Sequence, residues 1–433
     1  MPNRNVRSFM TLRSTHRSGR WLVWLVAAGV PALTTACDSL VDVAAPSRVI
    51  ADGLATPANA ALLVNGTGAD FECALAHYAV AGGLTGNELE IATGLIVMKE
   101  YDKRDFKTFG SSYAEATCAD QGNVGVYKPL SIARFQADNT LGLLDGWTDA
   151  EVPNRNVFIA TTAAYAGYSY IHLGEAMCTA AFDLGPEETP AQIFAHAEER
   201  FTKAMAAAQT AARADLVSLA QVGRARARMR LGKKTEAAAD AAAVPAGFRF
   251  DATYSGQSTR RRNAVWANLE LFQSTTVDPS YRNLTFGGVA DSRLSVFDAG
   301  KKATDGVSEL WSTHKYTGDG SPIAMATWEE AQLIIAEVSG GQTAVGIINA
   351  LHSAVGLPPF ASSDPAAIQT QIVEERKRQF FLDGHHLGDV RQYNIPLTPA
   401  PGTPFKDGGG VYQNQTCFPL PDIERLNNPN LNH

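Results

Sequence analysis

The sequence of 433 residues lacks the short motifs that mark the commonest catalytic sites. No Gly-rich phosphate-binding loop leads into a helix, and no serine stands between glycines as in a nucleophile elbow. The five cysteines show no CxxC spacing, so we expect no zinc site. The apolar run near the N-terminus is shorter than the roughly 20 residues that a membrane-spanning helix needs. The sequence therefore gives no positive reason to expect an enzyme, a metal or a cofactor.

Basic residues are unevenly distributed along the chain. Residues 1–36 contain five arginines and neither lysine nor an acidic residue. The whole chain has 37 basic and 44 acidic residues, so without these five arginines the remainder has a net charge near −12. Nucleic-acid-binding proteins present a basic face to the phosphate backbone. The acidic body therefore excludes nucleic acid as the expected partner.

The N-terminus has the three parts of a secretory signal peptide. A basic stretch precedes the apolar run Trp21–Leu33, and small residues follow it up to Ala36. Pro31 interrupts the run, which also disfavours a spanning helix. We therefore predict that residues 1–36 are a signal peptide that is removed on export.

Cys37 follows directly, and the sequence Leu-Thr-Thr-Ala-Cys resembles a bacterial lipobox. The leucine stands four residues before the cysteine, one more than in the usual pattern. Lipidation of Cys37 would give stable anchoring, because two or more acyl chains such as palmitate bury enough methylene groups. The alternative is ordinary cleavage near Ala36, which leaves Cys37 as a plain thiol.

Export places the other four cysteines in a compartment where disulfides form. Four cysteines allow three pairings. We favour Cys73–Cys118, which is local, and Cys178–Cys417, which would tie the C-terminal tail to an early helix.

The spacing of apolar residues predicts a mostly α-helical chain. Between Asn156 and Val244 alanine is abundant, and large apolar residues recur at helical spacing. Small residues at regular places let paired helices approach closely, as in tetratricopeptide-like repeats. An Ala-rich bundle without repeat stacking is the alternative. The expected organisation is a tether in 37–57, a helical part with tetratricopeptide-like hairpins in 58–247, a loop-rich insert in 248–326, and a C-terminal helical hairpin and closing segment in 327–433.

Four segments together resemble the SusD/RagB family of outer-membrane lipoproteins. They are the run CDSLVDVAAPSRV, the element HKYTG followed by WEEAQLIIAEV, the segment EERKRQFFLDGHHLGDVRQYN, and the closing CFPLPDIERLNNPNL. They occur in the family's order and extend over nearly the whole mature chain. The resemblance implies a mostly helical, SusD-like fold with a loop-rich ligand-side subdomain, anchored by lipid in the cell outer membrane.

The resemblance also implies a function. Such proteins bind a nutrient, glycan or peptide, and deliver it to a TonB-dependent, SusC-like transporter without catalysing a reaction. The alternative is a periplasmic tetratricopeptide-type scaffold, since repeat hairpins build surfaces suited to another polypeptide. A secreted hydrolase is the least favoured class.

Aromatic residues in loops are the expected ligand contacts, because flat rings cover the apolar face of a sugar while polar groups bind its hydroxyls. The expected ligand-binding residues are Trp147, Trp266, Tyr281, Trp311, Asn268, Arg282 and Asn283. Core packing is the alternative for each of these aromatic rings.

The densest polar cluster lies between Glu374 and Arg391. His385, His386 and Asp389 could in principle bind a metal. We favour a structural role, because arginine forks match carboxylates and can fix a helix–turn junction.

Overall fold

The computed structural model describes residues 51–120 and 122–431. The architecture below is that of the compact unit Asp52–His433. The predicted signal peptide, Cys37 and most of the tether lie outside the described residues. None of the helices in the described part combines the length and apolar character needed to cross a membrane.

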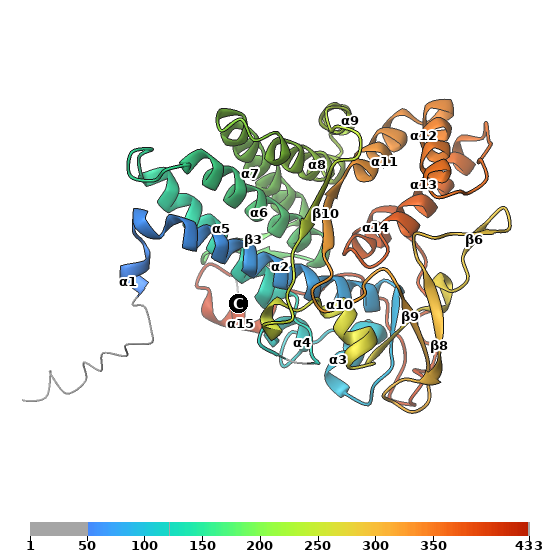
Figure 1. The fold of residues 1–433 in the computed structure, drawn as a ribbon. Coiled ribbons are helices and arrows are strands. Elements are labelled where there is room, and N and C mark those ends of the chain that lie inside the picture. Colours follow the sequence, from blue (N-terminus) through green and yellow to red (C-terminus); the bar gives the residue numbers. More distant parts are fainter. Residues whose placement is uncertain (1–50, 121, 432–433) are drawn as a thin grey trace, which may run out of the picture. The chain divides into compact units, whose positions relative to one another are not determined.

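Helices that pack against one another in pairs form the main body (Figure 1). α2 packs on α5, α6 on α7, α8 on α9, and α11 on α12, while α11 also contacts α9. Their bounds are α2 Ala60–Thr85, α5 Tyr127–Gly146, α6 Arg155–Ala176, α7 Pro190–Thr210, α8 Ala214–Arg230, α9 Lys234–Ala242, α11 Trp328–Ser339 and α12 Gly341–Ala354. The predicted mostly helical fold with tetratricopeptide-like hairpins is therefore confirmed.

Glycine allows the closest helix contacts in this body. The buried Phe201 ring of α7 lies against Gly167 of α6 and Gly223 of α8. A Cβ atom built on these glycines would lie 2.7 Å and 2.3 Å from the ring. The two glycines thus let three helices close around one aromatic side chain.

Replacing Gly223 by alanine should lower the free energy of unfolding by about 1–3 kcal/mol, because the added methyl group overpacks the site around Phe201. Gly142 is the matched control, since it lies inside α5, is exposed and has no atom within 4 Å of its Cβ position. Alanine there should stabilise the protein by about 0.5–1 kcal/mol through helix propensity alone. Urea denaturation of both variants measures the difference, and equal effects would contradict this packing.

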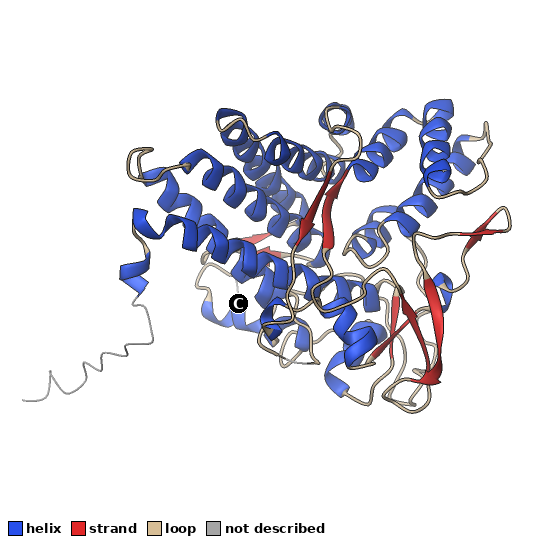
Figure 2. Ribbon diagram, in the orientation of Figure 1, coloured by secondary structure: helices blue, strands red, loops and turns tan. Residues whose placement is uncertain are grey.

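Short strands and irregular segments lie between and beside the helices (Figure 2). Each strand pairs antiparallel with one other: β1 with β5, β2 with β3, β4 with β10, β6 with β7, and β8 with β9. Their bounds are β1 Leu89–Ile91, β2 Ala180–Ala181, β3 Glu187–Glu188, β4 Arg249–Ala252, β5 Thr275–Val277, β6 Thr285–Phe286, β7 Val289–Ala290, β8 Val296–Lys302, β9 Glu309–Thr313 and β10 Ile323–Thr327. Most of them lie in the stretch predicted to be rich in loops.

Short helices and turns complete the described chain. α10 and η4 follow one another in the loop-rich region, and α13 and α14 carry the polar cluster of the sequence. Their bounds are α1 Ala51–Leu54, η2 Pro57–Asn59, α3 Ile96–Lys103, α4 Ser112–Glu115, η3 Thr259–Arg261, α10 Ala264–Trp266, η4 Ala267–Leu271, η5 Pro279–Tyr281, α13 Pro365–Gln379, α14 His386–Tyr393 and α15 Asp422–Asn427.

Two segments that carry the family resemblance meet in the structure. Lys315 Nζ donates to Asp383 at 2.7 Å and to the carbonyl of Phe381 at 2.6 Å. The Tyr316 hydroxyl lies 2.7 Å from the other Asp383 oxygen. The Lys-Tyr element therefore holds the turn between α13 and α14.

Charged side chains at the same junction form what we call the buried ion cluster, namely Glu175, Arg226, Arg230, Glu330, Arg376 and Asp389. Arg376 donates two hydrogen bonds of 2.8 Å to the carboxylate of Asp389. Three carboxylates thus face three guanidinium groups between α6, α8, α11, α13 and α14. No group of three or more metal-ligating side chains occurs among the residues described. The polar segment is a packing element in this structure.

The structure contains two disulfides, Cys73–Cys118 and Cys178–Cys417, the pairs favoured from the sequence. The first joins α2 to the loop between α4 and α5. Beside the second, Cys178 N donates to the carbonyl of Phe418, and Phe418 N donates to that of Ala176. The C-terminal segment is therefore held against the end of α6.

Candidate ligand-binding site

The ligand-binding residues expected from the sequence do not form one site. Trp147 lies at the C-terminal end of α5, partly buried against the core. Trp266 is also partly buried, at the end of α10. Tyr281 is 1% exposed and its ring stacks on Phe381 at a centroid distance of 4.8 Å. Tyr281 is thus a core residue in this structure, because Phe381 covers its face.

Trp311 and Arg282 are the two predicted residues that contact each other. The Arg282 guanidinium lies 5.2 Å from the centroid of the Trp311 ring. It also donates to the carbonyl of Val277 and to Glu90 at 3.3 Å. Asn283 follows with an exposed side chain and a φ of +55°. The arginine therefore covers one face of the partly buried indole.

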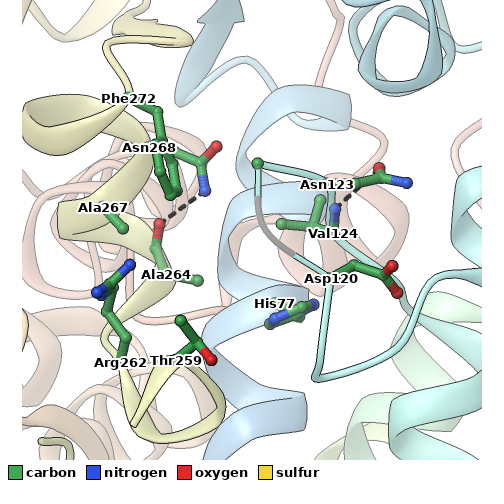
Figure 3. Close-up of a pocket in the computed structure, with 11 residues that line it drawn as sticks. His77, Asp120, Asn123, Val124, Thr259, Arg262, Ala264, Ala267, Asn268 and Phe272 are labelled. Carbon is green, nitrogen blue, oxygen red and sulfur yellow. Dashed lines mark hydrogen bonds between the residues drawn. The ribbon is translucent and has the colours of Figure 1, made fainter. Parts of the chain in front are cut away.

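A narrow pocket, the Arg262 pocket, lies between α2, the loop that precedes α5, and the η3–η4 segment (Figure 3). Figure 3 shows Arg262 and Thr259 on one side, Asp120 and Asn123 on the other, and His77 between them. Its free volume is about 30 Å³. Its lining includes His77, Asp120, Asn123, Val124, Thr259, Arg262, Ala264, Ala267, Asn268 and Phe272.

Three consecutive arginines differ in whether they pair with an acidic residue of α2. Arg260 pairs with Asp70, and Arg261 donates to Glu72 at 2.7 Å. Within the described part of the chain, the carboxylate in ion-pair range of Arg262 is that of Asp319, whose Oδ2 lies 3.9 Å from Nε. That Nε is buried and has no hydrogen-bond partner there. A separation of 3.9 Å is too long for a hydrogen bond. One guanidinium group is therefore left facing the pocket, although its side chain is only 20% exposed.

His77 reaches the pocket from α2 and is 7% exposed. Gly125 N–H donates to its Nδ1 at 3.2 Å, so the proton of the neutral ring lies on Nε2. Burial lowers the pKa of His77 to about 4, and the nearby Asp120 only partly offsets this. At neutral pH the ring is therefore uncharged, and Nε2–H is a donor toward the pocket.

The opposite wall supplies an acceptor and an amide. Asp120 Oδ2 accepts from Thr117 N–H and from its hydroxyl, and these bonds lower the pKa of Asp120. The carboxylate is thus ionised and held in place. Asn123 Oδ1 accepts from Val124 N–H, which turns the Asn123 amide nitrogen away from its own backbone.

The remaining walls combine an aromatic ring with an amide that is held by hydrogen bonds. The half-buried Phe272 ring supplies an aromatic surface. Asn268 is fixed by hydrogen bonds to the Ala264 carbonyl and the Ser274 hydroxyl. Of the residues predicted from the sequence, Asn268 alone lines this pocket. The disulfide at Cys118 ties the adjacent loop to α2.

Two larger grooves of about 490 Å³ and 500 Å³ lie on either side of α4. The first, between α5 and α15, carries the exposed apolar side chains of Phe135 and Ile423. In the second, beside α3, Lys99 pairs with Asp407 and Lys107 pairs with Asp105. Because the first groove exposes apolar side chains and these charges of the second are paired with each other, we take the Arg262 pocket as the candidate site.

Solved structures with the same fold identify its type. No family model matches the sequence, and no curated protein matches it. A SusD-like carbohydrate binding protein from Bacteroides vulgatus matches with a TM-score of 0.63 and 14% identity over 87% of this chain and 97% of its own. A SusD superfamily protein from Parabacteroides distasonis matches with a TM-score of 0.64 and 12% identity over 89% and 99%. The surface glycan-binding protein A of Bacteroides uniformis matches with a TM-score of 0.58 and 13% identity over 82% and 93%. The SusD-like fold predicted from the four segments is confirmed.

Proposed function

We propose that this SusD-like chain is a non-catalytic carbohydrate-binding protein that holds a glycan at the Arg262 pocket. The observation that carries the proposal is a fold match over 87% of the chain to a SusD-like carbohydrate binding protein. The pocket supports it, because a few placed polar groups beside an aromatic wall are typical of sugar sites. His77 Nε2–H and Asn123 can donate to sugar oxygens, Asp120 can accept from hydroxyls, and Phe272 can cover a C–H face.

The proposal extends to the place of the protein in the cell. Lipidation of Cys37 anchors it in the outer membrane, and a TonB-dependent, SusC-like transporter receives the ligand. Native membrane extraction followed by mass spectrometry should find a barrel that co-purifies and an acylated Cys37 peptide. A soluble protein with a free Cys37 and no barrel would instead support the periplasmic scaffold.

Glycan binding is tested with the mature full-length protein by affinity electrophoresis in a panel of neutral and acidic polysaccharides. At least one polysaccharide should retard the protein. Phe272→Ala should weaken that binding about tenfold, or roughly 1.4 kcal/mol, because the sugar loses its aromatic contact. Phe109→Ala is the matched control, because Phe109 is 76% exposed and belongs to the α3 groove. If both variants bind the polysaccharide equally well, the assignment of the site is wrong. If no polysaccharide retards the protein, the proposed carbohydrate-binding function is wrong.

A further inference from the structure

The Arg262 guanidinium has more donor capacity than the protein uses. No hydrogen bond from its side chain occurs among the residues described, and its Nε is buried. An arginine presents five N–H donors and stays charged. Nε is the buried nitrogen of this group, and the Asp319 carboxylate, 3.9 Å away, is too far to accept a hydrogen bond from it. An anionic oxygen pair would satisfy the guanidinium in two charge-assisted bonds.

His77 points to the same kind of ligand independently. The ring is more than nine-tenths buried, its Nδ1 is occupied by Gly125 N–H, and its Nε2–H has no partner in the described residues. His77 and Arg262 line the same pocket, and the neutral N–H of His77 adds a second donor for oxygen without adding an acceptor. Two donors favour an anionic oxygen group on the Arg262 side of the pocket, while Asp120 on the opposite wall is an acceptor for sugar hydroxyls.

The size of the pocket limits what can enter. A space of about 30 Å³ exceeds the roughly 10–15 Å³ that one water requires. It is far below the several hundred Å³ of a site that encloses a whole ligand. The space therefore suits a small charged group of a sugar rather than a whole sugar ring.

We infer that the bound glycan is acidic, and that Arg262 and His77 receive a carboxylate or sulfate group of one of its sugars. This inference rests on the proposed carbohydrate function and names its substrate class. Asp120 on the opposite wall is itself negative, so the anionic group lies at the Arg262 side and the sugar hydroxyls lie toward Asp120. The body of the chain is acidic, so the attraction is local and falls with added salt.

The test is calorimetric titration of the mature full-length protein with oligogalacturonate, its methyl ester, chondroitin sulfate oligosaccharides and a neutral galactan oligosaccharide. Binding of oligogalacturonate at least tenfold tighter than its methyl ester supports a carboxylate. Binding of the sulfated oligosaccharide in preference to all the others supports a sulfate. The ester comparison changes only the ligand and does not depend on any variant folding.

Arg262→Gln should reduce acidic-glycan binding at least tenfold and leave neutral-glycan binding unchanged. Arg260→Gln is the matched control, because Arg260 is exposed and pairs with Asp70 outside the pocket. Equal binding of ester and acid, or unchanged binding by Arg262→Gln, would overturn the inference while the carbohydrate function stands. Failure of every glycan would overturn both. Arg262-dependent binding of a peptide through its C-terminal carboxylate would overturn the sugar assignment.

Discussion

Replacing Glu175 by glutamine should lower the free energy of unfolding by about 3–5 kcal/mol, since it removes one partner from buried ion pairs. The Glu175 side chain is 1% exposed. Arg226 donates to both of its oxygens at 3.0 and 2.6 Å, and Arg230 donates at 3.1 and 2.8 Å. Urea denaturation at pH 7 measures the loss.

The size of this effect follows from charge balance inside the buried ion cluster. Burial disfavours the charged form of Glu175, but Arg226 and Arg230 outweigh it and hold the pKa of Glu175 well below its ordinary value. The carboxylate is therefore charged in the folded state. Without it, two carboxylates face three guanidinium groups, and one buried positive charge is left uncompensated.

Two further variants separate charge balance from simple loss of contact. Glu199→Gln is the surface control, since its side chain is 70% exposed and such an ion pair contributes roughly 0–1 kcal/mol. The double variant Glu175→Gln, Arg226→Gln restores equal charge and should recover part of the lost stability. A double variant as unstable as the sum of both single variants would contradict the charge-balance account.

Much of the fold was predictable because its causes are local in sequence. The alanine and apolar spacing of α6–α9 specifies helices that pack closely, whatever the rest of the chain does. The Glu374–Asn394 segment was predicted to be structural from its mixed charges. Its acids and arginines do pair, as Arg376 and Asp389 show. The contact between Lys315 and Asp383 could not be predicted from local spacing, because the two residues are 68 positions apart in the sequence.

The candidate site was not predictable in the same way. Its groups come from residues 77, 120, 262 and 272, which no periodicity relates. The three consecutive arginines are visible in the sequence, but Asp70 and Glu72 on α2 decide which one lacks a close carboxylate partner. Tyr281 was expected to bind ligand because it is aromatic, but its exposure depends on where Phe381 packs, which the sequence does not show. The type of a residue indicates which ligand it could bind, but only its packing in the fold decides whether a ligand can reach it.

Replacing Glu88 by glutamine should make the stability of the protein much less dependent on pH between about 5 and 8. Glu88 is buried, and its Oε1 accepts from Leu382 N–H at 2.7 Å at the turn after α13. Its Oε2 has no hydrogen-bond partner in the described structure. Burial therefore raises the pKa of Glu88 from 4.5 to about 8, and the bond from Leu382 only partly opposes this.

The sign of the effect follows from proton binding. Between these two pKa values the folded state holds a proton that the unfolded state has released, so the free energy of unfolding falls as pH rises. The stabilisation is complete below pH 4.5 and is lost as pH approaches 8. The difference between these two pKa values corresponds to a change of at most about 5 kcal/mol in the free energy of unfolding. Burial also raises the pKa of Asp102 and of Glu100 to about 7, which adds to the same trend.

Glutamine keeps the acceptor for Leu382 N–H and carries no charge at any pH. Glu88→Gln should therefore match the wild type near pH 5 and exceed its stability by several kcal/mol at pH 8, as measured by urea denaturation at pH 5, 6.5 and 8. Glu236 is exposed at the start of α9. The free energy of unfolding of Glu236→Gln should therefore change with pH in parallel with that of the wild type. Parallel curves for Glu88→Gln as well would mean that the Glu88 carboxylate stays charged in the folded protein. A counter-charge or water would then have to reach Oε2. The turn between α13 and α14 would be held by that charge rather than by a neutral acid.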